Sequence, residues 1–375
     1  MNILVVAGNN YPSSAEPQNG TFVYKLIQEF VLLGNNVSVV APQKYSLKMK
    51  YNVDYGEESA VIFRPKSLSF SNKKIWFINT IYFTNYFQSK AIKNAVSNMI
   101  LKPEIIYCHF IVSGLLYNQA FPNLKLPVFI AVGEYNNIDV IRKNYKSEYY
   151  SEFINKVSGF IAVSPQIKDK LISLGVQEKN IILEPNGTDL NKFKPRNKKE
   201  LRARYGLPLD KKIILFVGRF IESKGPLRVQ EALYKLGDDV SAIFIGKGPQ
   251  QLNHPKILFS GALGHNTVAE YMALADVFVL PTLHEGSSNV IVEAMASGLP
   301  IVSSNLPEIR VQCKSDFATL VDPMNVDEIV NALNNILGDG NLREIMSQSA
   351  LKASKHFDIN QRAQRILEFI KQNLE

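Results

Sequence analysis

The sequence predicts an α/β protein made of two Rossmann-like domains, each with a parallel sheet covered by helices. The first observation behind this prediction is that apolar segments of strand length alternate with helical patterns along nearly the whole chain. The second is that this alternation runs through two successive series, and 375 residues are more than one ordinary core accommodates. Two such series imply two sheets that face each other across a cleft, with ligands at the carboxyl ends of the strands.

The first series contains five expected strands and four expected helices. The strands are short apolar runs at 2–7, 37–41, 105–108, 128–132 and 159–163. The helices are expected at 20–33, 79–100, 113–120 and 165–174. No solenoid-type repeat and no low-complexity segment interrupts this order.

The second series starts at Lys212. Its expected strands are 213–217, 241–245, 257–260, 277–280 and 300–303. Its expected helices are 226–237, 266–274, 288–297, 326–337 and 341–355. Between the two series lies the turn-rich stretch 184–191, which the basic stretch 192–199 follows. We expect the hinge here and place the domain boundary after residue 188.

The composition is that of a soluble globular protein, with 46% hydrophobic and 20% charged residues. No apolar run approaches the length of a membrane span. The first residues lack a basic region and lead directly into a polar loop, so we interpret them as a strand and not as a signal peptide, and expect a cytoplasmic protein. Cys108 and Cys313 are the only cysteines and are expected to be buried thiols.

The formal charge of +8 is concentrated in the first half, where residues 1–188 hold 19 lysines and arginines against 13 acidic residues. The basic residues that precede an aromatic-rich segment are Lys44, Lys48, Lys50, Arg64, Lys66, Lys73 and Lys74. That segment contains Trp76, Phe77, Tyr82, Phe83, Tyr86 and Phe87. Exposed aromatics beside basic residues suit an anionic membrane surface or a lipid-linked acceptor. A solvated basic face over a core helix with inward aromatics is the alternative, and no motif indicates nucleic-acid binding.

The most informative stretch is 285–298, where Glu285 and Glu293 flank an expected junction between a strand, a loop and a helix. Ser287 or Ser288 is the expected N-cap, so the backbone N–H groups of the first helical turn face the loop. Such a helix start binds anions. One carboxylate can then meet a sugar while the other meets a second pair of hydroxyls beyond a diphosphate. The competing interpretation is that Glu285 caps a loop and Glu293 is a solvated helix residue.

Three further motifs accompany the two glutamates. The stretch 185–189 (PNGTD) contains the pair Asn186-Gly187, which tolerates positive φ in a turn. The stretch 216–225 (FVGRFIESKG) combines a strand, a glycine-bounded loop and a helix start, and the strand ends 244–249 and 257–263 follow it. In these motifs and their order the chain resembles the retaining glycosyltransferases of the GT-B fold in family 4, which includes bacterial lipopolysaccharide, capsule and mannosyl transferases.

This resemblance implies a nucleotide-sugar site. Arg219 and Lys224 occupy the positions of the cations that bind the donor diphosphate, Glu285 would meet hydroxyls of the donor sugar, and Glu293 would accept the ribose hydroxyls. Two cations and helix N–H groups stabilise the charge that a departing nucleoside diphosphate gains. The implied catalytic residues are Glu285, Arg219 and Lys224. The implied donor-binding residues are Gly20, Gly218, Arg219, Lys224, Gly246, Leu263, Glu285, Gly286, Ser287, Ser288, Asn289, Val290 and Glu293.

The first domain follows the family pattern less closely. Gly20 matches the glycine-rich loop near the donor phosphates, with one glycine where many relatives have two. His109 and Glu134 are candidates for the acceptor side. Val132 replaces a histidine of many relatives, which puts the catalytic arrangement on this side in question. The resemblance assigns acceptor binding to 1–188, nucleotide-sugar binding to 189–355, and a helix that crosses back to the first domain to 356–375.

Neither an Asp-x-Asp motif nor a metal-binding spacing of histidines is present, so no metal and no cofactor is expected. The resemblance implies a retaining, metal-independent glycosyltransferase. It would move a hexose or N-acetylhexosamine from a UDP- or GDP-sugar to a lipid-linked surface glycan of capsule, O-antigen or lipopolysaccharide type, on the inner face of the cell membrane. The alternatives are a noncatalytic GT-B partner subunit and a nucleotide-sugar epimerase.

Overall fold

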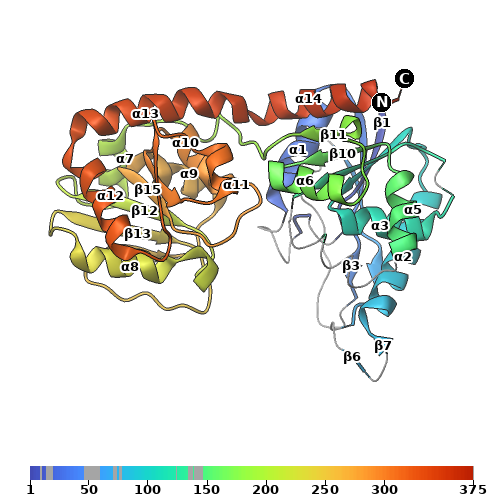
Figure 1. The fold of residues 1–375 in the computed structure, drawn as a ribbon, viewed down its shortest axis with the longest axis horizontal. Coiled ribbons are helices and arrows are strands. Elements are labelled where there is room, and N and C mark those ends of the chain that lie inside the picture. The colour runs from blue at the N-terminus through green and yellow to red at the C-terminus, as the bar shows by residue number, and fades with distance from the viewer. Residues whose placement is uncertain are drawn as a thin grey trace. The chain divides into compact units, whose positions relative to one another are not determined.

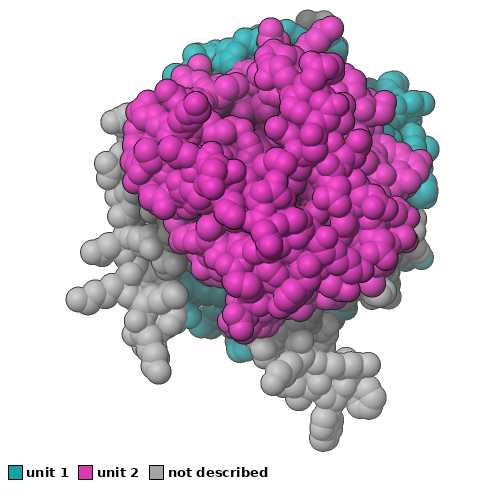
Figure 2. Space-filling model, turned by 90° about the vertical axis from the view of Figure 1, so that its left-hand side faces the viewer, with its two compact units in different colours: residues 1–185, 360–375 teal, residues 186–359 magenta. Residues whose placement is uncertain are grey.

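The computed structural model describes residues 1–8, 11–13, 20–45, 60–70, 74–75, 78–123, 125–133, 138 and 147–374. The chain forms two compact units, which Figure 2 distinguishes by colour. Unit 1 comprises Met1–Pro185 and Asn360–Glu375, and unit 2 comprises Asn186–Ile359. The first break lies within the turn-rich stretch 184–191, three residues before the boundary expected from the sequence.

Unit 1 is built on a seven-stranded parallel sheet in the order β11-β10-β9-β8-β1-β2-β4. These strands are β1 (Asn2–Val6), β2 (Asn36–Val40), β4 (Val61–Phe63), β8 (Ile105–His109), β9 (Val128–Val132), β10 (Gly159–Ala162) and β11 (Ile181–Leu183). Its helices are α1 (Thr21–Leu32), α2 (Ile81–Ser97), α3 (Ile111–Ala120), α5 (Ser147–Asn155), α6 (Pro165–Ser173) and α14 (Ile359–Gln372), drawn in Figure 1. The central strands β8 and β9 are buried on both faces, as is typical of a parallel sheet covered by helices on both sides.

The sequence did not predict several short elements of unit 1. These are β3 (Gln43–Lys44), β4, β5 (Lys66–Ser67), β6 (Lys74–Ile75), β7 (Ile78–Asn79), α5, the 3₁₀ helix η1 (Glu178–Asn180) and β11. Except for the nine-residue α5, these are runs of two or three residues, which are too short to show a periodicity. In contrast, α14 agrees with the final helix expected from the sequence, and it packs on unit 1 through the ring of Phe369, whose centroid lies 6.2 Å from that of Phe129.

Unit 2 contains a six-stranded parallel sheet in the order β14-β13-β12-β15-β16-β17. Its strands are β12 (Lys212–Val217), β13 (Val240–Ile245), β14 (Ile257–Gly261), β15 (Val277–Leu280), β16 (Ile301–Ser304) and β17 (Ala318–Val321). Its helices are α7 (Lys198–Arg204), α8 (Pro226–Lys235), α9 (His265–Leu274), α10 (Asn289–Ala296), α11 (Pro307–Gln312), α12 (Val326–Gly338) and α13 (Gly340–Ser354), with the 3₁₀ helices η2 (Glu222–Lys224) and η3 (Lys355–Phe357). The sequence did not predict α7, α11 or β17.

The prediction of two parallel sheets covered by helices is therefore confirmed. In unit 2 the strand β12 lies between β13 and β15, so the loops that follow these three strands leave the same edge of the sheet. These loops contain the motif residues 218–225, 246–249 and 281–288. Over the described ranges, no helix combines the length and the apolar character that crossing a membrane requires.

Candidate functional site

In unit 2 the loop after β12, which contains Gly218, and the loop after β13, which contains Gly246, are joined by backbone hydrogen bonds. The Gly218 N–H donates to the Ile245 carbonyl at 2.9 Å, and the Phe220 N–H donates to the Lys247 carbonyl at 3.0 Å. A Cβ atom at Gly246 would lie 1.8 Å from the Gly218 carbonyl oxygen. Only glycine permits this approach. Gly218 and Gly246, both expected in the site, thus join the loops after β12 and β13.

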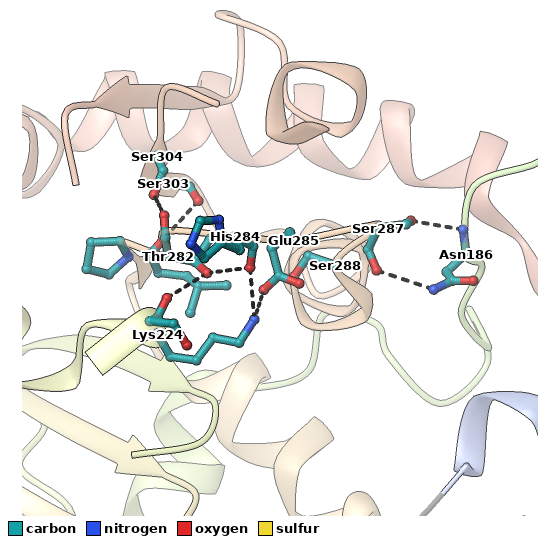
Figure 3. Close-up of polar contacts among 12 residues, drawn as sticks. Asn186, Lys224, Thr282, His284, Glu285, Ser287, Ser288, Ser303 and Ser304 are labelled. Atoms are coloured by element: carbon teal, nitrogen blue, oxygen red, sulfur yellow. Dashed lines mark hydrogen bonds and ion pairs between the residues drawn. The ribbon is translucent and has the colours of Figure 1, made fainter. Parts of the chain in front are cut away.

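The two expected cations, Arg219 and Lys224, differ in their surroundings. Arg219 is exposed, and its guanidinium has no hydrogen bond or ion pair with any residue that the structure describes. Lys224 is the last residue of η2, and its Nζ forms an ion pair with Glu285 Oε1 and donates to the His284 carbonyl at 3.4 Å (Figure 3). The side chains of Lys224 and Glu285 are only 18% and 14% exposed. The fold therefore joins two motifs that are 61 residues apart.

Buried hydroxyl groups anchor the loop that carries Glu285. Thr282 is fully buried, and its Oγ1 lies 3.0 Å from the carbonyl oxygens of both Ser223 and His284. The Ser304 hydroxyl donates to the Thr282 carbonyl at 2.5 Å, and the Ser303 hydroxyl donates to the Leu280 carbonyl at 2.8 Å (Figure 3). These bonds attach the loop after β15 both to η2 and to the end of β16.

The start of α10 differs from the expectation in one detail. Ser288 occupies the N-cap position, but neither its hydroxyl nor any other side chain caps the helix. Instead the Ser288 N–H donates to Gln312 Oε1 at 2.8 Å. The Ser287 hydroxyl accepts from the Asn186 N–H at 3.0 Å, and the Asn186 amide donates to the Ser287 carbonyl at 3.3 Å (Figure 3). The expected N-cap position of Ser288 is therefore confirmed, but its hydroxyl makes no capping bond, and the first N–H groups of α10 stay without a side-chain cap.

Gly187 is needed for close packing and not for a turn with positive φ. Neither Asn186 nor Gly187 has a positive φ. A Cβ atom at Gly187 would lie 2.8 Å from the carbonyl oxygen of Phe357. The pair therefore does not use the positive φ that it tolerates, while its expected geometric role agrees with the bonds that Asn186 makes to Ser287.

Glu293 lies in α10 and is 6% exposed, which excludes the interpretation that it is a solvated helix residue. Its Oε1 lies 3.0 Å from Nε2 of His265, the first residue of α9. Burial lowers the pKa of Lys192, while the charges of Glu293 and Asp189 raise it, so the lysine ammonium lies near this carboxylate. Leu263 is half-buried between β14 and α9, and Gly286, Asn289 and Val290 are half-buried as well.

The site candidates of unit 1 are Gly20, His109 and Glu134. Gly20 has a φ of 67° and precedes α1. His109 ends β8 and is 4% exposed, and burial, with a smaller effect of Arg362, lowers its pKa to about 3. Val132 ends β9 and is buried. Glu134 lies outside the described residues.

Several residues that shape these loops and the surroundings of Glu293 were not predicted from the sequence: Thr282, Ser303, Ser304, Gln312 and His265. Three of them have a signal in the sequence, because polar residues at the carboxyl ends of buried parallel strands commonly face a ligand site. Within the described ranges, no three His, Cys, Asp or Glu side chains gather as a metal site would require.

Comparison with known proteins gives two family matches. Residues 20–192 match the description "Glycosyltransferase Family 4", and residues 197–353 match "Glycosyl transferases group 1". The chain is 25% identical over 344 residues to the putative teichuronic acid biosynthesis glycosyltransferase TuaC of Bacillus subtilis, with 86% of both chains covered. It is 29% identical over 211 residues to an Escherichia coli enzyme named UDP-Gal:alpha-D-GlcNAc-diphosphoundecaprenol alpha-1,3-galactosyltransferase, with 52% of this chain and 54% of the enzyme covered.

The fold is also similar to solved structures. The structure of Anabaena HepE in complex with UDP-glucose superposes with a TM-score of 0.72 at 17% identity, covering 99% of this chain and 100% of HepE. The two family matches together extend over most of the chain, in the order in which the sequence motifs occur. The chain therefore belongs to glycosyltransferase family 4 and is a GT-B glycosyltransferase that uses a nucleotide-sugar donor.

Proposed function

We propose that this protein is a retaining, metal-independent glycosyltransferase that moves a hexose or N-acetylhexosamine from a UDP- or GDP-sugar to a lipid-linked surface glycan. The observation that carries the proposal is the ion pair between Lys224 and Glu285. Glu285 lies in the loop before α10, and the first turn of this helix has no side-chain cap. A UDP-sugar is the favoured donor, because UDP appears in the names of both the Escherichia coli relative and the Anabaena complex.

The donor diphosphate would bind at the start of α10. The backbone N–H groups of a first helical turn point outward along the axis, and the helix dipole favours an anion there. Arg219 and Lys224 would supply two cations for the same diphosphate. Lys224 has three N–H donors, so it can bind phosphate while it stays next to Glu285.

The two glutamates would bind different parts of the donor. Glu285 would accept hydrogen bonds from hydroxyls of the transferred sugar, and Glu293 would accept both ribose hydroxyls, because one ionised carboxylate can serve a diol. Backbone groups of Gly246 and Leu263 would border the base. Gly20 would approach the donor phosphates, and His109 and Glu134 remain the candidates for the acceptor side, with residues 1–188 binding the acceptor and 189–355 the donor.

In the proposed reaction the bond between the anomeric carbon and the diphosphate oxygen breaks, and its electron pair leaves with the nucleoside diphosphate. The acceptor hydroxyl attacks from the same face of an oxocarbenium-like sugar and gives its proton to the leaving phosphate. Arg219, Lys224 and the α10 amides stabilise the negative charge that grows on the diphosphate, which is the task that a metal ion performs in other enzymes.

The surface of α2 supports a membrane-bound acceptor. At the start of this helix the buried side chains are polar (Thr84, Gln88 and Ser89), whereas Tyr82, Phe83 and Tyr86 are 49%, 48% and 51% exposed. The alternative with inward aromatics is therefore wrong for these three residues. Lys44, Lys66 and Lys90 are exposed in the same unit. We propose that this aromatic surface docks on the anionic inner face of the cell membrane. Lys48, Lys50, Lys73, Trp76 and Phe77 lie outside the described residues.

Donor binding and turnover test the proposal together. We expect one class among UDP- and GDP-sugars to raise the unfolding temperature without Mg²⁺, and the product to keep the anomeric configuration of the donor, as NMR would show. A donor that binds but is never transferred to any lipid-linked acceptor would favour a noncatalytic subunit. A strict requirement for Mg²⁺ would contradict the metal-independent reaction.

The proposed docking of α2 on the membrane can be tested separately. Replacement of Tyr82, Phe83 and Tyr86 by serine should abolish flotation with vesicles of anionic lipid, because the exposed rings supply the apolar contact. The same variant should keep its affinity for the nucleotide. Unchanged flotation would show that another surface binds the membrane.

A further inference from the structure

Groups from two other segments of unit 2 lie near the carboxylate of Glu293. Glu293 itself belongs to α10, His265 opens α9, and Lys192 lies in the stretch that precedes α7. The contact between Glu293 Oε1 and His265 Nε2 measures 3.0 Å. Glu293 is thus held from outside its own helix. An ionised carboxylate only accepts hydrogen bonds, so Nε2 of His265 is the donor in this contact.

The imidazole ring of His265 is itself fixed in place. The fully buried ring of Phe193 meets it edge to face, with centroids 5.0 Å apart and an interplanar angle of 88°. Phe193 in turn is held by a local turn in which its N–H donates to the Asp189 carbonyl at 2.9 Å. The same turn holds Lys192, whose N–H donates to Asp189 Oδ1 at 3.2 Å. The stretch 189–193 therefore supports the histidine and brings a cation near Glu293.

A glutamate side chain needs such support to bind a diol. The last torsion of glutamate is broad, so a carboxylate without a partner samples many orientations of its two oxygens. A hydrogen bond to one oxygen fixes the plane of the carboxylate and occupies one of about four acceptor sites. The remaining sites then point in directions that the fold determines.

On the basis of the donor site proposed above, we propose that His265 is a positioning residue, which orients the Glu293 carboxylate so that it accepts both ribose hydroxyls of the donor nucleotide. His265 does not touch the reacting atoms. Its role is to make the affinity for the nucleotide depend on the ribose hydroxyls. His265 is not part of the sequence motifs of the site.

The test compares nucleotides with and without the ribose hydroxyls. Calorimetry measures the Kd of UDP and of 2′,3′-dideoxy-UDP, or of the guanosine pair if the wild-type protein binds GDP instead. His265→Phe keeps the ring volume beside Phe193 but removes the donor, and we expect it to weaken binding of the ribonucleotide about tenfold while leaving the dideoxy compound unchanged. His265→Gln carries an amide N–H at about the position of Nε2 and should restore most of the preference for ribose.

Two controls separate positioning from folding. His265→Asn is polar but too short to reach Glu293, so it should behave like His265→Phe, and it replaces that variant if the phenylalanine protein does not fold. His254→Phe changes a buried histidine on a different loop of unit 2, whose Nδ1 accepts from the Lys256 N–H at 3.0 Å, and should keep the wild-type ratio of the two Kd values.

The outcomes distinguish this inference from the proposed function. If the wild-type protein prefers the ribonucleotide and the phenylalanine and asparagine variants keep that preference, His265 does not position Glu293, and the donor site stands. If these variants weaken the binding of the ribonucleotide and of the dideoxy compound equally, the role of His265 is only structural. If the wild-type protein binds neither UDP nor GDP, the proposed donor site itself is wrong.

Discussion

The ion pair between Lys224 and Glu285 is the contact on which the proposed chemistry most depends. Lys224→Ala removes a cation from the leaving diphosphate and leaves Glu285, which is 14% exposed, without its partner. We expect kcat to fall by about 10²–10³ because charge stabilisation at the transition state is lost. Steady-state transfer assays on a folded variant measure this. Lys235→Ala, at an exposed ion pair with Asp327, is the matched control and should keep full activity.

His109 predicts how stability depends on pH. Burial lowers its pKa from 6.5 to about 3 in the folded protein. Between these pH values the imidazole is therefore protonated in the unfolded chain and neutral in the folded chain. This contribution to stability is complete above pH 6.5 and is lost progressively between 6.5 and about 3, by at most about 1.4 kcal/mol per pH unit. His109→Gln should therefore make the free energy of unfolding depend less on pH across this range, which urea titrations at several pH values would measure. An unchanged slope would mean that folded His109 accepts a proton.

At the scale of elements, Asp276 connects the start of β12, the approach to β15 and α7. Its Oδ2 accepts from the Ile213 N–H at 2.7 Å and from Arg202 at 2.6 Å, and its Oδ1 accepts from Lys198 at 2.7 Å. The Arg202 side chain is 5% exposed. Asp276→Ala would leave this buried guanidinium without a counter-charge, with only its hydrogen bonds to the Leu274 and Lys211 carbonyls. We expect a loss of about 3–5 kcal/mol in the free energy of unfolding.

Chemical denaturation of unit 2 measures this loss. The exposed pair of Arg204 and Glu200 on α7 offers a control, since Glu200→Gln should cost less than about 1 kcal/mol. Equal midpoints for the Asp276 and Glu200 variants would show that the buried pair does not hold these elements together.

At the scale of the whole molecule, unit 1 is formed by both ends of the chain. The buried residues that α14 contributes to unit 1 are Arg362, Ala363, Ile366, Leu367, Phe369 and Ile370. Arg365 binds both oxygens of Glu184 at 2.8 and 2.9 Å. Each large apolar side chain contributes about 1.5–3 kcal/mol when buried, and a domain has only about 5–15 kcal/mol in total.

Deletion of 360–375 should therefore prevent unit 1 from folding, while unit 2 still binds the nucleotide. Calorimetry would show one unfolding transition in place of two. A peptide of residues 360–374 added to the truncated protein should recover the missing transition. A truncated protein that unfolds like the full chain would contradict this dependence on α14.

The sequence by itself determined five strands of each sheet, most of the longer helices, and the glycines of the loops after β12 and β13. It also placed Glu285 in a loop and Glu293 in the helix that follows. Each of these depends on local patterns, namely apolar periodicity and close approaches that only glycine allows. Elements of two or three residues, such as β3 and β11, were not predicted because they are too short to show a periodic pattern.

Only the tertiary structure decided how the site is held. The bonds from Lys224 to Glu285, from Asn186 to Ser287 and from His265 to Glu293 span 61, 101 and 28 residues. Likewise, the Ser287 hydroxyl accepts from the distant Asn186 N–H and the Ser288 N–H donates to the Gln312 side chain, neither of which the helix-start pattern indicated. A hydrogen bond between distant residues depends on where the folded sheet brings them, and no local pattern in the chain encodes that position.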